Sequence, residues 1–133
     1  MIDTRVRVGS VELTAPVMTA SGTAGYGTEL GGYLDLAALG AVVTKSLAPY
    51  EWPGNPPPRV HPTPQGMMNA VGLQGPGVQY WLDHVVADLV ASGATIVASV
   101  WGRSVDDYAR AAELLAAAPP EVVAIEVNLS CPN

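Results

Sequence analysis

The sequence predicts an α/β fold, namely the N-terminal half of a (β/α)8 TIM barrel preceded by a β-hairpin. Two observations lead to this fold class: short apolar strands alternate with helices, and a hairpin precedes them. Alternation of this kind gives parallel strands joined by helical crossovers. A complete barrel typically needs about 250 residues. We therefore expect residues 1–133 to form one partial barrel domain that holds the hairpin, the first four strands and three helices.

A small doubly wound sheet is the other architecture that four parallel strands allow. We favour the barrel because no helix follows the fourth strand, where a doubly wound domain would normally carry one to cover its sheet. The hairpin also fits a barrel better, since it can close the bottom of the barrel.

The first third of the chain contains the hairpin, a strand and a helix. Residues 6–13 alternate between apolar and polar side chains around a Gly-Ser pair, which predicts the hairpin. Residues 16–20 form a short apolar strand that runs into the glycine-rich loop 21–27. A helix follows from about Thr28 and stops at Gly40. Helical periodicity predicts that its buried face holds Leu30, Tyr33, Leu34 and Ala37.

The next segments continue the alternation. Residues 41–45 are apolar up to a polar end, as is typical of parallel strands buried on both faces. The long loop 46–77 carries most of the prolines, and loops of this length are usually functional. We expect a small ribbon within it, around residues 59–61 and 67–69. A second helix then ends at Gly93, and its buried face is expected to hold Val78, Leu82, Val85 and Leu89.

The last elements are a strand, a helix and a strand. Residues 95–100 form the third strand. Ser104 is expected to cap the third helix, with Asp107 completing an imperfect capping box. Residues 122–127 form the fourth strand.

Composition excludes several classes of protein. The net charge is −6 without any basic run, which argues against nucleic-acid binding. No apolar stretch approaches the roughly 20 residues that span a bilayer, and the N-terminus lacks the features of a signal peptide. A single cysteine cannot form an intrachain disulfide, so we expect a cytoplasmic protein. His61 and His84 lack metal-like partners, and no metal site is predicted.

Polar residues follow every predicted strand, and the carboxyl ends of parallel strands share one rim, where α/β proteins bind ligands. Lys45 is the only lysine, and it serves either as a functional cation or as a lysine that reaches solvent. Cys131 is the only cysteine, either reactive or an inert buried thiol. Asn128 either binds a ligand or anchors its loop. The glycines of loop 21–27 do not form a dinucleotide fingerprint.

Five stretches of the chain together resemble the dihydroorotate dehydrogenase family, in family order. They are Pro16–Thr23, Gly40–Ser46, Gly54–Arg59, Asn69–Gln74 and Glu126–Asn133. The resemblance covers the whole chain but only the family's N-terminal half. It implies an FMN-dependent oxidation of (S)-dihydroorotate to orotate, in which a base removes the C5 proton and the C6 hydride passes to the flavin. The base position matches Cys131, and a cysteine base marks the soluble class.

The resemblance also implies partners. The Asn-Ala-Val-Gly-Leu form of the loop that begins at Asn69 is similar to the subclass that passes electrons to a separate FAD and iron–sulfur subunit and then to NAD. A complete enzyme of this kind is expected to be a homodimer.

The resemblance assigns roles to individual residues. Positions that match flavin contacts are Ala20, Ser21, Lys45, Ser46, Ser99 and Asn128. Relatives often carry Asn at the position of Ser99. Positions that match substrate contacts are Lys45, Asn69, Ala70, Val71, Gly72, Leu73, Asn128 and Asn133.

Two other interpretations remain open. Dihydropyrimidine dehydrogenases share the Asn-x-Ser-Cys-Pro pattern but have His after the Pro, where this chain has Asn133. A non-catalytic half barrel, either a fragment or an interaction module, is the alternative from another class. The second half of such barrels binds the FMN phosphate, so we expect the isolated 133-residue chain to be inactive and to bind FMN weakly or not at all.

Overall fold

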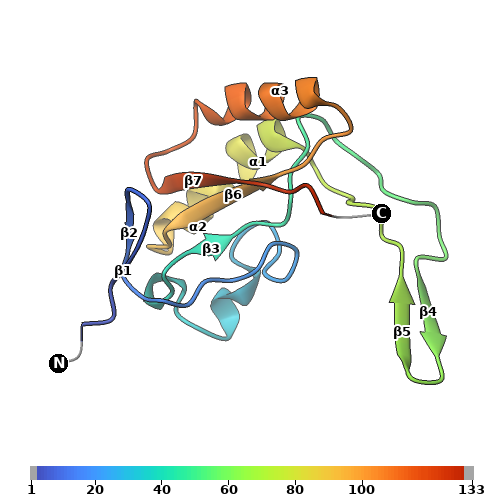
Figure 1. Ribbon diagram of the computed structural model, residues 1–133, viewed down its shortest axis with the longest axis horizontal. Coiled ribbons are helices and arrows are strands. Elements are labelled where there is room, and N and C mark those ends of the chain that lie inside the picture. Colours follow the sequence, from blue (N-terminus) through green and yellow to red (C-terminus); the bar gives the residue numbers. More distant parts are fainter. Residues whose placement is uncertain (1–2, 131–133) are drawn as a thin grey trace.

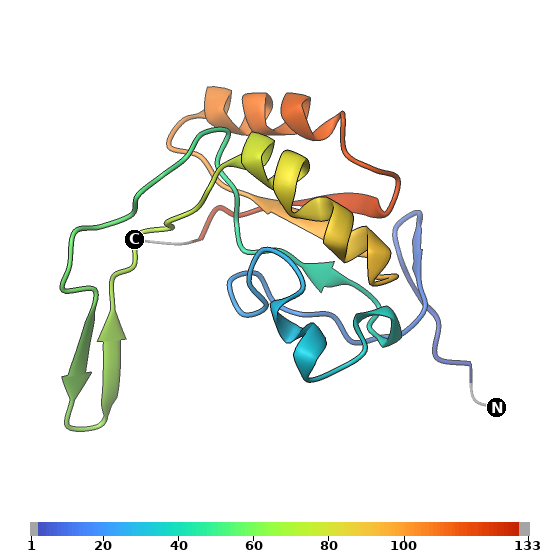
Figure 2. The same ribbon diagram turned by 180° about the vertical axis from the view of Figure 1, so that it is seen from behind.

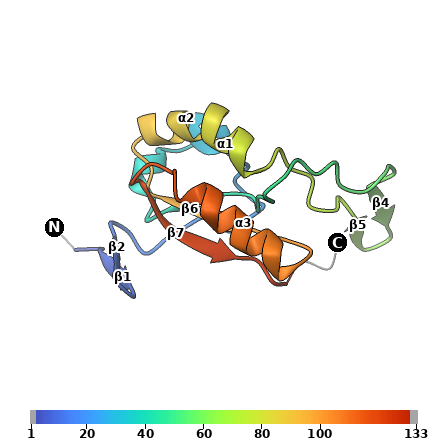
Figure 3. The same cartoon turned by 90° about the horizontal axis from the view of Figure 1, so that it is seen from above.

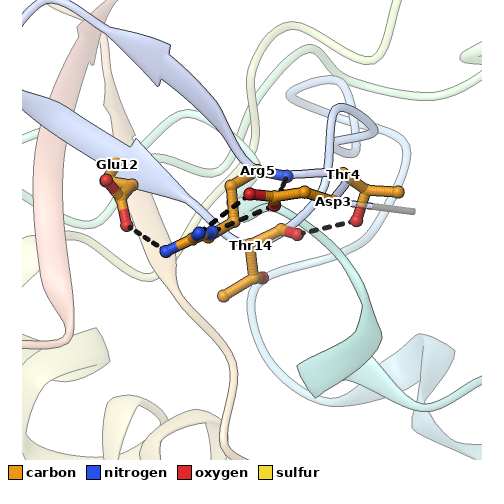
Figure 4. Close-up of polar contacts among 5 residues, drawn as sticks. All are labelled: Asp3, Thr4, Arg5, Glu12 and Thr14. Atoms are coloured by element: carbon orange, nitrogen blue, oxygen red, sulfur yellow. Dashed lines mark hydrogen bonds and ion pairs between the residues drawn. The ribbon is translucent and has the colours of Figure 1, made fainter. Parts of the chain in front are cut away.

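The computed structural model describes residues 3–130. It begins with the predicted hairpin, formed by β1 (Val6–Val8) and β2 (Val11–Leu13) in antiparallel register. The Arg5 guanidinium binds the Asp3 carboxylate at 2.8 Å and lies 3.7 Å from Glu12 (Figure 4). The bond from Arg5 lowers the pKa of the exposed Asp3 carboxyl below its ordinary value.

The central sheet contains β3 (Val42–Val43), β6 (Ile96–Val100) and β7 (Val122–Val127), which are parallel and lie in sequence order. The two later strands match the prediction closely, whereas β3 is shorter than expected. The prediction of a full strand at residues 16–20 is wrong, because only Met18 bridges to Ala41 at the edge beside β3.

Thr19 explains why the predicted first strand is so short. Its hydroxyl accepts the Val43 N–H at 2.7 Å and donates to the Val43 carbonyl, with an oxygen–oxygen distance of 3.3 Å. A side chain therefore takes the place of the backbone groups that would have continued the ladder. The backbone leaves the sheet at this point.

The predicted helix after Thr28 is also wrong, since two short 3-10 turns replace it: η1 (Glu29–Gly32) and η2 (Leu36–Ala38). Two glycines in succession, Gly31 and Gly32, disfavour a continuous α-helix. The Asp35 side chain then accepts the Ala37 N–H and starts the second turn.

The buried face of this segment differs from the predicted one as well. Leu36 is buried, whereas Tyr33 is 89% exposed and Leu34 is exposed. Leu30 is half-buried and Ala37 is exposed. The error in the predicted face follows from the break in the helix, because helical periodicity does not extend across it.

The second predicted helix is divided into α1 (Val78–His84) and α2 (Val86–Ala91) by Val85, whose φ of −122° is not helical. Val78 and Leu89 are buried as expected, while Leu82 and Val85 are half-buried. Trp81 was not predicted, yet it is completely buried, and its Nε1 donates to the Tyr26 carbonyl at 2.7 Å.

The third helix, α3 (Val105–Leu115), has the predicted capping box. The Ser104 hydroxyl accepts the Asp107 N–H at 3.3 Å, and the Asp107 carboxylate accepts the Ser104 N–H at 3.2 Å. No helix within residues 3–130 combines the length and apolar character needed to cross a membrane.

The predicted ribbon in the long loop is confirmed as β4 (Val60–Thr63) paired antiparallel with β5 (Gly66–Asn69). Figures 1 and 2 show it projecting from the body on the side where the parallel strands end. Most of its residues are exposed.

The two faces of the sheet differ in what covers them. Ile96, Ala98 and Val100 of β6 are buried in one core cluster with residues of α1, α2 and α3, so all three helices cover the same face. Val97 and Ser99 alternate with them and face the other way. The hairpin lies at the opposite end of the sheet from the ribbon (Figures 1 and 3), where it lines an apolar cavity of about 180 Å³ together with Met18 and residues of β6 and β7.

Candidate functional site

Polar residues from three chain segments meet where the parallel strands end. Figure 1 shows that the ribbon projects on this side of the sheet. Ser46 follows β3, Ser99 lies near the end of β6, and Asn128 follows β7. Ser46 and Ser99 are 3% and 0% exposed, respectively. The register of the sheet sets Ser99 beside Glu126. The structure therefore brings three of the predicted site residues together at one rim.

Four side chains form a continuous hydrogen-bonded chain at this rim. Asn128 Nδ2 donates to Ser46 Oγ at 2.9 Å, the Ser46 and Ser99 hydroxyls lie 2.8 Å apart, and Ser99 Oγ donates to Glu126 Oε1 at 2.7 Å. An ionised carboxylate only accepts hydrogen bonds, and a serine has one hydrogen to donate. Ser99 therefore donates to Glu126, Ser46 donates to Ser99, and Asn128 donates to Ser46.

The orientation of the Asn128 amide follows from its other neighbours. The Ser130 N–H can only donate, and it lies 3.1 Å from Asn128 Oδ1. The nitrogen of the amide must therefore face Ser46. Within the described residues, one of its two hydrogens remains available for an acceptor on a ligand.

The backbone of Asn128 is held as well. Its N–H donates to the Val100 carbonyl at 2.9 Å, and its carbonyl accepts the Tyr108 hydroxyl at 2.8 Å. Asn128 thus anchors its loop through the backbone, while its side chain retains a donor. These contacts bear out the anchoring role of Asn128, whereas ligand binding by its side chain stays a prediction.

Lys45 is half-buried and lines a cavity of about 590 Å³ together with Tyr26, Val71 and residues of the long loop. Its backbone N–H donates to the Gly25 carbonyl at 2.8 Å, which holds the glycine-rich loop against the end of β3. Burial and the nearby Glu29 raise the pKa of Tyr26 to about 12. Tyr26 therefore stays neutral at physiological pH and donates to the Gln74 carbonyl at 2.5 Å.

The loop that follows β5 is fixed by bonds to its carbonyl groups. Asn55 binds the Ala70 and Val71 carbonyls at 2.9 and 3.0 Å through its side-chain and backbone nitrogens, and Trp52 Nε1 binds the Gly72 carbonyl at 2.8 Å. Gly72 has a φ of +78°, and a Cβ built there would lie 2.6 Å from the backbone nitrogen of Asn55. Leu73 follows with a φ of +56°.

Other predicted residues lie apart from the hydrogen-bonded chain. Ala20 is exposed and Ser21 is half-buried in the glycine-rich loop, and the Ala20 carbonyl accepts bonds from Thr23. Asn69 is exposed at the end of β5 and lines a separate small cavity with Arg59. Cys131 and Asn133 lie outside the described residues. His61 and His84 are both exposed.

Sequence reasoning missed two features of this rim. Glu126 ends the hydrogen-bonded chain, and the available signal was its position two residues before Asn128, which puts both side chains on one face of the strand. Trp101 and Arg103 line a cavity of about 340 Å³ with Asn128, and the Arg103 guanidinium lies 4.9 Å above the Trp52 ring. Within residues 3–130, no cluster of His, Asp and Glu is suited to hold a metal ion.

Comparisons with known proteins agree with the resemblance in the sequence. The family model described as dihydroorotate dehydrogenase matches residues 4–133. Proteins named dihydroorotate dehydrogenase B (NAD(+)), catalytic subunit, are similar to this chain. The relative from Desulforudis audaxviator is 46% identical over 132 residues, which are 99% of this chain and 43% of the relative.

Two further relatives carry the same name. The protein from Trichlorobacter lovleyi is 48% identical over 128 residues, covering 96% of this chain and 42% of that protein. The protein from Phocaeicola vulgatus is 41% identical over 133 residues, covering 100% of this chain and 44% of that protein. The chain thus spans less than half the length of these curated relatives, and over that span it belongs to the dihydroorotate dehydrogenase family.

Proposed function

We propose that this chain is the N-terminal half of the catalytic domain of an FMN-dependent enzyme that oxidises (S)-dihydroorotate to orotate in pyrimidine synthesis. The observation that carries the proposal is the hydrogen-bonded chain of Asn128, Ser46, Ser99 and Glu126 at the strand ends. It occurs in a chain whose relatives are named catalytic subunits of dihydroorotate dehydrogenase B.

The arrangement of the sheet supports a half barrel. The strands lie in sequence order, and all three α-helices pack on one face. A doubly wound domain would place helices on both faces of its sheet. In barrels the ligand site lies at the carboxyl ends of the strands, which is where this chain gathers its polar residues.

The donors at this rim suit a flavin, because the oxygens and unprotonated nitrogens of the isoalloxazine ring accept hydrogen bonds. Asn128 has an amide hydrogen to offer within the described residues. Lys45 directly precedes Ser46 in the sequence and lines the cavity of about 590 Å³. We infer that the flavin is held by Ala20, Ser21, Lys45, Ser46, Ser99 and Asn128. When bound, FMN would supply the acceptor for the hydride that leaves C6 of dihydroorotate.

The remaining residues are proposed to bind and deprotonate the substrate. Orotate has a carboxylate and ring amides, which require paired donors and acceptors such as asparagine amides. Asn128, Asn133 and the loop Asn69–Leu73 would supply these groups, with Lys45 touching both substrate and flavin. Cys131 would accept the C5 proton. A thiol normally has a pKa of about 8.5, so this role requires a nearby cation or oriented donors that favour the thiolate.

The names of the relatives suggest where the electrons go. They are catalytic subunits of an NAD(+)-type enzyme. We therefore propose that a partner subunit with FAD and an iron–sulfur cluster receives the electrons and passes them to NAD in the cytoplasm. A homodimer of the catalytic subunit is the corresponding assembly.

The test is stopped-flow reduction of FMN by dihydroorotate in the protein that carries these 133 residues. Cys131→Ser is expected to slow flavin reduction at least 100-fold, because general-base catalysis typically contributes 10²- to 10⁴-fold. Orotate binding, measured by the change in flavin absorbance, should remain within a few-fold of the parent protein. Reduction at close to the parent rate would show that another group is the base.

A further inference from the structure

Glu126 ends the hydrogen-bonded chain at the strand ends, but the proposed function gives it no contact with flavin or substrate. It lies in β7, half-buried, and within residues 3–130 its carboxylate has one hydrogen-bond partner, the Ser99 hydroxyl at 2.7 Å. Glu126 also lines the cavity of about 180 Å³, and the other residues that line this cavity are apolar. A carboxylate in such surroundings has a stronger interaction with its hydroxyl partner than it would have in water.

The carboxylate determines the direction of the whole chain of hydrogen bonds. With Glu126 as a pure acceptor, the Ser99 hydrogen points to Glu126 and the Ser46 hydrogen points to Ser99. Ser46 Oγ is then left to accept the amide hydrogen of Asn128. The amide oxygen is consequently turned toward the Ser130 N–H, which is the arrangement observed.

A neutral group at position 126 would remove this directionality. A glutamine offers both a donor and an acceptor, so the Ser99 hydrogen could point toward Ser46 instead. The Ser46 hydrogen would then point at the Asn128 amide, which could accept it only by turning its oxygen toward Ser46. That flip would leave the Ser130 N–H facing an NH₂ group, which cannot accept it.

We propose that Glu126 is a positioning residue that acts through Ser99 and Ser46 to fix the Asn128 amide, so that its remaining hydrogen is presented to the bound flavin. This role rests on the proposed function, because it takes FMN as the ligand at this rim. Glu126 itself need not touch the cofactor.

The experiment measures FMN affinity by fluorescence quenching, with the apo form of the protein that carries this chain. Glu126→Gln is expected to weaken FMN binding about tenfold and Glu126→Ala by at least as much, since hydrogen bonds to charged groups are the stronger ones. Glu113→Gln, which removes an exposed carboxylate on α3, serves as the matched control and should leave the affinity unchanged.

A double-mutant cycle with Ser99→Ala separates positioning from a general effect on the fold. If Glu126 acts through Ser99, Glu126→Gln should change FMN affinity less than twofold in the Ser99→Ala background. A full tenfold loss in that background, or no loss in the parent background, would overturn the role of Glu126. A parent protein that binds no FMN would instead overturn the proposed function itself.

Thermal unfolding of the apo proteins tests for a purely structural role, because such a role would lower the apo melting temperature of the variants. The positioning role predicts that Glu126→Gln weakens FMN binding while the apo melting temperature stays within a few degrees of the parent value. Loss of affinity that tracks the loss of apo stability across Glu126→Gln, Glu126→Ala and Ser99→Ala would contradict it.

Discussion

Replacing Gly72 by alanine tests whether the loop after β5 is held as tightly as its contacts indicate. The new Cβ would lie 2.6 Å from the Asn55 backbone nitrogen and 2.7 Å from its side-chain Cγ, so Asn55 must move. The φ of +78° adds strain for any residue with a Cβ. Asn55 also binds the Ala70 and Val71 carbonyls, and these bonds would be disturbed in the same step.

The size of the effect can be worked out from these two causes. Left-handed backbone costs about 1–2 kcal/mol for a residue with a Cβ, and forced displacement of packed atoms costs about 1–3 kcal/mol. We therefore expect Gly72→Ala to lower the free energy of unfolding by about 2–5 kcal/mol. Urea unfolding measures it, and the fluorescence of Trp52, whose Nε1 donates to the Gly72 carbonyl, reports on the loop itself.

Two glycines of the same chain serve as matched controls. Gly22 has a φ of +82° but nothing within 4 Å of a built Cβ, so Gly22→Ala should show the backbone strain alone. Gly66 also has open space around its Cβ and lacks the positive φ, so Gly66→Ala should be nearly neutral. If Gly72→Ala costs no more than Gly22→Ala, the close packing of Asn55 against the loop does not constrain it.

Two further predictions concern α3 and Lys45. The bond from the Arg103 N–H, followed by those from Tyr50 and Ser104, lowers the pKa of the Asp107 carboxyl. Because the pKa of Asp107 is lower in the folded state than in the unfolded state, its carboxylate stabilises the fold at pH values above the unfolded-state pKa of about 3.9. This contribution to stability is lost as the pH falls through the folded-state pKa. The urea midpoints of the parent protein and Asp107→Asn should therefore converge below about pH 4; a constant gap would contradict this. Lys45→Ala should weaken FMN retention and turnover by at least tenfold. Unchanged flavin content and rate would refute a role for this ammonium. Lys45→Arg tests whether a compact charge is required.

The sequence predicts the elements whose signals are local and unbroken. The strand at residues 122–127, the capped helix from Ser104 and the ribbon within the long loop all appear where the pattern places them. The prediction of a helix after Thr28 is wrong because it extended a short helical pattern of apolar residues across two consecutive glycines. Backbone entropy outweighs the periodicity there, and tertiary contacts then bury Leu36 in place of Tyr33.

The spatial grouping of the predicted site residues was predictable in part, for a similar reason. Strand ends can be read from the sequence, so the grouping of Ser46, Ser99 and Asn128 was predictable. The position of Asn69 was not, because the ribbon carries it outward and its placement depends on how the loop is anchored by Asn55 and Trp52. These anchoring contacts join residues that lie 15 and 20 positions apart, and no local pattern indicates them.

Polar residues at the ends of the strands fall into two groups that the sequence alone does not separate. Thr19 and Thr44 direct their hydroxyls back into the sheet, where they accept the backbone N–H groups of Val43 and Ser99. These threonines complete the hydrogen bonding of the sheet and have a structural role. Ser46 and Ser99, in contrast, bond to each other and connect Glu126 with Asn128.

This division sharpens the argument that polar strand ends mark a ligand site. A hydroxyl that bonds to the backbone of its own sheet is accounted for by the fold, since buried N–H groups must be paired. Burying two serines next to a half-buried carboxylate is unfavourable unless each is bonded, and an apolar core would not need them. The hydrogen-bonded series of side chains from Glu126 to Asn128 ends in an amide that keeps one unused N–H donor within the described residues. This unused donor is a stronger argument for a bound ligand than the number of polar residues at the rim.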